Sequence, residues 1–530
     1  MLAREGDAST SPQARSFVTD EEVKTALLAD LQDFNPAENA KDVRYLTLVN
    51  IANINDARGF PLSSTVDLDL YRSGVDKLLN SLSWRAKIVR SHPIDENKLI
   101  LRVRLSDYGW DAAFWERIIT FYPYAVLSGS KTERATMDIT GTDAPFIRAD
   151  WFVFALSQPP LYDEALSLPG NHGNEAADVL LEKRLGVTVE SNWATARAVR
   201  SGFETSGVSL GHRMVERHPL PDLGGYWKSY DFNPSRKTQP GGNLFAAPLG
   251  PESAGLAGNA RLEFKHDGVE ILWALPNGLQ AYMVVDATGR QLGQAPRELM
   301  RDASRADGVI INGVSCMSCH INGMFPPPGD EITKASGTAF GAADTTNVRR
   351  LYRQGDIAAF VADDTARFQG ALAACGVDRG GKVEPVRALY DRFLSAISAA
   401  SINSEFGVQE DVLGRLSQGD QDLKIFADKL KTGVSIPRLH FINQFKAGAA
   451  SLHLALKTFQ APPFEQFGGE KNLAFAMQES GLKMEPPLPG GHAGSIAKAK
   501  QRALEFAEAY RSQGFRSSPL GAGGLRADSF

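Results

Sequence analysis

Five consecutive residues combine two thiols and an imidazole at a spacing that suits haem attachment: Cys316-Met317-Ser318-Cys319-His320. Thiols three positions apart can each add across one vinyl group of a porphyrin, and the histidine that follows can bind the iron as its proximal ligand. The chain has only three cysteines and nine histidines, so chance seldom produces such a pentad. The motif predicts one covalent haem c, held by Cys316 and Cys319, with His320 on the iron.

Three other sites could use the same two cysteines. A zinc site would need two further ligands, and the sequence offers only Cys375 and scattered histidines for them. A redox-active dithiol would have to open a long helix, whereas prolines at positions 326–328 end any helix within two turns. A buried structural pair is the third alternative. Cys375 itself is expected at a buried helix end, as a small apolar residue.

The residue on the other side of the iron would decide the function of a haem. A thioether raises the haem potential, a second imidazole lowers it, and an open position admits small ligands. We expect His218 to be this distal ligand, with Met283 and Met324 as alternatives. Met324 is four residues from His320, about 13 Å at full stretch, and should therefore pack on the proximal side. Further donors that the sequence leaves open are His212, His266, Met300, His440 and His453.

Two residues near His218 in the sequence could complete a cofactor pocket. Arg217 could pair with a haem propionate, because arginine binds carboxylates through paired hydrogen bonds. Trp227 belongs to an aromatic run at residues 226–232, which would either wall a haem pocket or pack as ordinary core. The acid pair Asp363-Asp364 is expected to open a helix, with its charge at the helix N-terminus.

The elements that must position these residues indicate an α+β protein of three regions. Residues 1–159 predict an α/β module, with helices at 21–34, 67–84 and 111–122 and strands at 86–90 and 98–105. Residues 160–335 predict a central region with two helices in 174–200, an irregular segment at 207–249 and the haem motif. This region should also contain an antiparallel β-meander, with strands at 261–265, 269–275 and 279–286.

Residues 336–530 predict a mostly helical C-terminal region that closes over the haem and ends in a frayed tail. Helical spacing of apolar residues is found at 347–360, 363–374, 384–398, 421–430, 442–459 and 496–512.

Composition excludes several classes of function. The formal net charge of -5 gives no support for a nucleic-acid partner or an anionic membrane. No apolar stretch predicts a transmembrane segment, and no glycine-rich phosphate-binding loop supports a nucleotide role. Residues 1–15 are polar and lack the apolar core of a signal peptide, although haem is normally attached outside the cytoplasm. We therefore expect a periplasmic or cell-surface protein whose leader is not part of this sequence.

Short segments over much of the chain form a second pattern beside the pentad. They are Ser206-Gly207-Val208-Ser209, Glu216-Arg217-His218, Trp227-Lys228-Ser229-Tyr230-Asp231-Phe232, Leu275-Pro276-Asn277-Gly278-Leu279-Gln280 and Gly313-Val314-Ser315 before the pentad. With Trp84 and Leu105-Ser106-Asp107-Tyr108-Gly109-Trp110-Asp111, this series resembles a group of monohaem c-type cytochromes of Gram-negative bacteria such as planctomycetes, over most of residues 40–400. The resemblance implies a single covalent haem and export to the periplasm or cell surface, and it brings no established reaction. That group usually has Arg-Asn-Asn in place of Leu210-Gly211-His212, which favours His218 over His212 as a ligand.

The length of the chain bears on the function. A single-haem electron carrier needs only about a hundred residues, so the remaining chain should bind something else. The first hypothesis is therefore electron transfer, with extra domains that dock a redox protein partner or a substrate. The alternatives are a peroxidase-like haem enzyme and a gas-binding sensor, both with an open distal site.

Overall fold

The computed structural model describes residues 16–33, 39–55, 61–171, 175–252, 254–305, 307–326, 329–335, 340–378 and 380–456. They belong to the first of two compact units, Met1–Ala476, and the second unit, Met477–Phe530, lies outside the described residues. The helix predicted at 496–512 and the predicted tail also lie outside them.

A four-stranded sheet with strand order β2-β3-β1-β5 forms the centre of the N-terminal region. Its strands are β1 (Val43–Thr47), β2 (His92–Pro93), β3 (Ile100–Arg104) and β5 (Phe146–Arg148). The helices of this region are α1 (Asp20–Gln32), α2 (Val49–Ala52), α3 (Thr65–Ser81), α4 (Ala112–Ile119), α5 (Lys131–Thr140), α6 (Ala149–Leu156) and α7 (Leu161–Ala165). A short strand, β4 (Val126–Leu127), lies outside this sheet.

Local sequence signals explain much of this region. Capping boxes start α1 at Thr19 and α3 at Ser64, because each side chain accepts a hydrogen bond from the backbone three residues later. The three predicted helices and the strand at 98–105 are confirmed. The strand predicted at 86–90 was wrong, since these residues form bends and loop.

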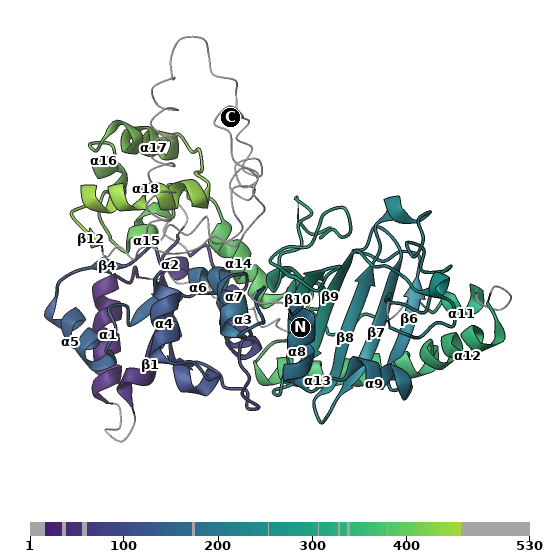
Figure 1. Ribbon diagram of the computed structural model, residues 1–530. Coiled ribbons are helices and arrows are strands. Elements are labelled where there is room, and N and C mark those ends of the chain that lie inside the picture. The colour runs from purple at the N-terminus through teal and green to yellow at the C-terminus, as the bar shows by residue number, and fades with distance from the viewer. Residues whose placement is uncertain are drawn as a thin grey trace, which may run out of the picture. The chain divides into compact units, whose positions relative to one another are not determined.

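A six-stranded antiparallel sheet forms the centre of the middle region, with strand order β11-β10-β9-β8-β7-β6 (Figure 1). Its strands are β6 (Val199–Phe203), β7 (Arg213–Leu220), β8 (Gly224–Asp231), β9 (Gly268–Ala274), β10 (Gln280–Asp286) and β11 (Gln291–Leu292). β9 and β10 confirm two strands of the predicted meander. The strand predicted at 261–265 was wrong, because a 3-10 turn (Ala260–Leu262) lies there instead. The segment at 207–249, predicted to be irregular, contains β7 and β8.

The register of this sheet separates its two faces, because directly paired residues of antiparallel strands share a face. On the face that we call the first, one row across the strands is Arg217, Trp227, Leu272 and Tyr282. On the second face, the neighbouring row is His218, Tyr226, Trp273 and Ala281. Helices α8 (Ala177–Leu185) and α9 (Val189–Ala194), which confirm the two helices predicted in 174–200, contact the second face.

The remaining described elements are almost all helical. They are α10 (Val314–Cys319), α11 (Ile332–Ala335), α12 (Ala342–Leu351), α13 (Gln354–Ala374), α14 (Pro385–Leu394), α15 (Ile402–Phe406), α16 (Val412–Leu416), α17 (Gln421–Lys431), α18 (Arg438–Ser451) and the strand β12 (Ala455–Leu456). The chain is therefore α+β, as predicted. The boundary predicted between helices at 360–363 was wrong, since the break falls at Tyr352-Arg353, between α12 and α13. Of the helices in the described part of the chain, none has the length and apolar character needed to cross a membrane.

Candidate functional site

The helix α10 carries the Cys-x-x-Cys-His motif and is anchored at its first residue. Gly313 precedes the helix with φ +93°, a conformation that favours glycine. A Cβ atom at this position would lie 2.4 Å from the carbonyl oxygen of Ser157 and 2.9 Å from the ring of Tyr162. The start of α10 therefore packs directly on the end of α6 and on α7, and no larger residue fits there.

The spacing of the motif places its two thiols on one side of α10. Residues three apart on a helix are neighbours, so Cys316 and Cys319 share a face, while Met317 points into the core and is 1% exposed. Both cysteines are free and half-buried. Burial raises the pKa of Cys316 well above its usual range and that of Cys319 to about 12. A dithiol oxidoreductase needs a lowered thiol pKa, so these surroundings argue against that alternative.

His320 follows α10 directly and is held in a defined orientation. Its Nδ1 lies 3.1 Å from the carbonyl oxygen of Gly323, so the neutral ring donates its N–H from this nitrogen. Gly323, at φ +106°, lets the chain turn back so that its carbonyl group reaches the ring. Burial lowers the pKa of His320 and so favours the neutral imidazole, the form that binds metals. Metal-binding histidines commonly donate their second nitrogen in this way, which leaves Nε2 for the metal.

A cavity of about 550 Å³ lies between α10 and the first face of the six-stranded sheet, and Cys316, Cys319 and His320 all line it. Cofactor and ligand pockets commonly measure about 300–1,000 Å³. Most of the wall is apolar or aromatic, with contributions from Val215, Trp227, Leu272, Tyr282, Val284, Ile310, Met324, Phe325 and Val361. The Tyr282 and Phe325 rings lie 5.7 and 5.4 Å from the ring of His320, centroid to centroid.

One ion-pair cluster interrupts the apolar wall. The guanidinium of Arg213 donates to both oxygens of Asp231, at 2.9 and 3.0 Å, and to Glu270 at 2.7 Å. Burial opposes the charge of Arg213, but the two carboxylates outweigh it and raise its pKa. Among the described residues of the wall, Arg213 is the one Arg or Lys and Glu270 the one carboxylate.

Trp227 and Arg217, two residues predicted for the pocket, both bind the carboxylate of a third residue, Asp364. This shared contact was not predicted. Trp227 lines the cavity, and its Nε1 donates to Asp364 of α13 at 2.9 Å. Arg217 donates to the same carboxylate at 3.0 and 3.3 Å and stacks on the Phe360 ring. The predicted role of Asp364 in opening a helix was wrong, because it lies in the middle of α13. Arg217 thus helps to hold Asp364, the hydrogen-bond partner of Trp227, and it does not line the cavity.

The expected distal ligand, His218, is not brought to this cavity, so that prediction needs correction. It lies on the second face of the sheet and is fully buried. Its Nε2 is 2.9 Å from Glu216 Oε1, and its Nδ1 is 3.3 Å from the Asn192 side chain. Side chains alternate between faces along a strand, so His218 points away from Trp227 and the cysteines.

The two methionine alternatives differ in placement. Met283 is fully buried and pairs with Ile271, so its side chain points to the second face although the residue borders the cavity. Met324 is half-buried in the cavity wall, and its backbone N–H donates to Thr365 Oγ1. The other candidate donors lie outside the described wall, which includes none of His212, His266, Met300, His440 and His453. Of these, Met300 contacts a wall residue, since its sulfur accepts a hydrogen bond from Arg213 at 3.3 Å.

Cys375 ends α13 and is fully buried, as predicted. In the described part of the chain, no three His, Cys, Asp or Glu side chains gather as a metal-binding group. No protein-family model, no curated protein and no solved structure matches the chain.

Proposed function

We propose that the chain binds one haem c in the cavity beneath α10, through thioether bonds to Cys316 and Cys319 and with His320 as proximal iron ligand. One observation carries this proposal: both thiols and an imidazole oriented by Gly323 line a single cavity of about 550 Å³. When bound, the haem would supply one-electron redox chemistry at its iron. The resemblance to monohaem c-type cytochromes supports the same cofactor.

The residues of the chain would hold and shield this group. Gly323 accepts the Nδ1–H of His320 and so keeps the lone pair of Nε2 directed away from the turn. Trp227, Leu272 and Val284 exclude water from the sheet side of the cavity. Arg213, fixed by two carboxylates, would face the cofactor in place of Arg217.

Electron transfer is the proposed role of the bound haem. The observation that favours it is Phe325, whose ring is 62% exposed and contacts the ring of His320. An aromatic side chain that joins an iron ligand to the surface gives a redox partner a short path to the cofactor. The expected partner is a redox protein, and the expected compartment is the periplasm or the cell surface, where covalent haem attachment takes place.

A haem enzyme is the second candidate, and Glu270 is the observation that favours it. Its carboxylate lies in the cavity wall, where it accepts a hydrogen bond from Arg213 and is 24% exposed. A carboxylate inside a cofactor cavity can take up or release a proton beside a bound substrate.

Optical spectra distinguish the two roles. The full chain is matured with a haem-attachment system and measured oxidised, reduced, and reduced under carbon monoxide. Electron transfer predicts a low-spin spectrum that carbon monoxide does not change, because both axial positions are filled. A high-spin spectrum that shifts with carbon monoxide would contradict this role and favour the enzyme or a gas sensor.

Two matched variants test whether a methionine is the second protein ligand of the haem iron. Met324→Leu and Met283→Leu both conserve volume and remove only the sulfur. If Met324 is the ligand, Met324→Leu alone should make the reduced protein bind carbon monoxide. Identical spectra of both variants and the wild type would exclude both methionines.

A further inference from the structure

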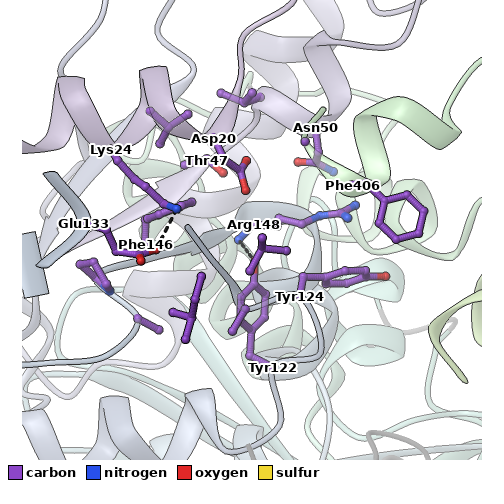
Figure 2. A pocket seen from close by; sticks show the side chains of 18 of the residues that line it. Asp20, Lys24, Thr47, Asn50, Tyr122, Tyr124, Glu133, Phe146, Arg148 and Phe406 are labelled. Atoms are coloured by element: carbon purple, nitrogen blue, oxygen red, sulfur yellow. Dashed lines mark hydrogen bonds and ion pairs between the residues drawn. The ribbon is translucent and has the colours of Figure 1, made fainter. Parts of the chain in front are cut away.

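A small cavity of about 60 Å³, with charged and apolar side chains in its wall, lies between the N-terminal region and α15. Its wall includes Asp20 at the start of α1, Asn50 of α2, and Glu405 and Phe406 of α15 (Figure 2). Since a water molecule takes up about 30 Å³ in the liquid, the cavity holds about two water-sized groups.

The charged side chains around this cavity have ion-pair or other partners, with one exception. Lys24 pairs with Glu133 at 2.8 Å, as the dashed line in Figure 2 shows. Arg148 pairs with Asp150 at 3.1 Å and with Glu405 at 2.7 Å, and Arg438 also binds Glu405. These three cations therefore match the three carboxylates that they contact. Asp143, also in the wall, has an interaction of its own.

Asp20 is the exception. Among the described residues, no side chain or backbone group forms a hydrogen bond or ion pair with its carboxylate, although Lys24 and Arg148 act on it from a distance. Burial raises its pKa to about 6, so the fold leaves this charge poorly compensated. The carboxylate lies against Gly407, where an added Cβ would stand 2.6 Å from Oδ1. Gly407 ends α15, so that helix adds no positive charge, and the N-terminus of α1, where Asp20 itself lies, offsets only part of the carboxylate charge.

Asn50 is a second, independent indication that the cavity lacks a hydrogen-bond donor. Its side chain is 8% exposed, and its Nδ2 donates to Asp150 at 2.8 Å. Its Oδ1 is buried and has no hydrogen-bond partner within the described part of the chain. In Figure 2 this oxygen points to the side of the cavity where Asp20 lies. A buried acceptor without a donor costs free energy, so a bound donor would stabilise the site.

We propose that this cavity binds the ammonium group of a primary amine, with Asp20 and Asn50 as its acceptors. A primary ammonium carries one positive charge and three N–H donors, which complement a lone carboxylate and an unpartnered amide oxygen. The rings of Tyr122 and Phe406 in the wall also favour a cation, whereas the Tyr124 ring already contacts the Arg148 guanidinium. An anion would meet the uncompensated charge of Asp20, and neutral molecules would leave that charge unbalanced. The site is separate from the haem proposal and does not depend on it.

The test is a titration of the full chain with methylammonium chloride, followed by ligand-observed NMR of the methyl group. Methylammonium has two heavy atoms, which the cavity can hold, and at a ceiling of about -1.5 kcal/mol per heavy atom its Kd should be about 6 mM or weaker. Asp20→Asn should weaken binding about tenfold or more, because it removes the charge and keeps the shape. Asp33→Asn is the matched control, since it removes an exposed charge at the other end of α1.

Tetramethylammonium chloride provides a second measurement that needs no variant. It carries the same charge without N–H donors and should not bind. Saturable methylammonium binding that is lost only in Asp20→Asn supports the site. Three results would overturn it: no saturable binding, equal binding by Asp20→Asn and wild type, or equal binding of the two ammonium ions by the wild type.

Discussion

Replacing Asp364 with alanine should destabilise the protein by about 3 kcal/mol. Its carboxylate receives two hydrogen bonds from Arg217 and one from Trp227. The side chains of Arg217 and Asp364 are 7% and 8% exposed, so the variant leaves a buried guanidinium without its counter-charge. Breaking such a pair costs about 3–5 kcal/mol. We expect the lower end, because the guanidinium keeps its contact with the Phe360 ring, 4.1 Å from the centroid.

The assay is urea denaturation followed by tryptophan fluorescence, with two matched variants. Asp363→Ala removes the exposed acid next to Asp364 on α13 and should change stability by no more than about 0.5 kcal/mol. The double variant Arg217→Met/Asp364→Leu removes both charges and should lie within about 2 kcal/mol of the wild type, because Trp227 loses the acceptor of its Nε1–H. Equal denaturation midpoints for Asp364→Ala and Asp363→Ala would refute the reasoning. So would a double variant less stable than Asp364→Ala.

Four further predictions concern other parts of the chain. Gly313→Ala should cost about 2–5 kcal/mol, from positive φ and the contact with Ser157, and should reduce haem attachment. Gly370→Ala, where nothing lies within 4 Å, should instead stabilise α13 by up to about 1 kcal/mol in the same denaturation assay. For Asp20, a folded-state pKa of about 6 against the ordinary value of 3.8 means that wild-type stability falls as pH rises from about 4 to 6. Asp20→Asn should therefore raise the stability at pH 7 by up to about 3 kcal/mol and leave it unchanged below pH 4, and a Tm difference that is equal at both pH values would contradict this. His218→Ala should lower the stability by about 2–3 kcal/mol, because Glu216 loses a buried hydrogen-bond partner. It should leave the haem spectrum unchanged. A changed spectrum would indicate that His218 binds the iron after all.

The elements that the sequence predicted well are those whose signals are local. The helices α1, α3 and α4 combine caps and apolar spacing within their own residues. β9 and β10 are apolar strands joined by a glycine turn. Such patterns need no knowledge of distant parts of the chain.

The strands β7 and β8 could not be predicted because their polar residues are compensated by distant partners. Arg213 pairs with Asp231 across the strands, and Glu216 pairs with Arg200. Lys228 binds Asp178, fifty residues earlier. A strand buried on both faces normally reads as apolar, so this segment, rich in Gly, Pro and aromatic residues, was predicted to be irregular.

The wall of the candidate site was only partly predictable for the same reason. Trp227 and His218 are nine residues apart on a hairpin, and their faces depend on a register that the sequence does not specify. Asp364 is 147 residues from Arg217, so their ion pair had no local sign. Glu270 is 57 residues from Arg213, so their ion pair had no local sign either.

The most direct test of the haem proposal is the mass of the denatured protein after maturation with a haem-attachment system. The proposal predicts that wild type and Cys375→Ala both keep one haem through denaturation, on the peptide that contains Cys316 and Cys319. The double variant Cys316→Ala/Cys319→Ala should keep none. Wild-type protein that carries no covalent haem, or a double variant that still carries one, would contradict the account.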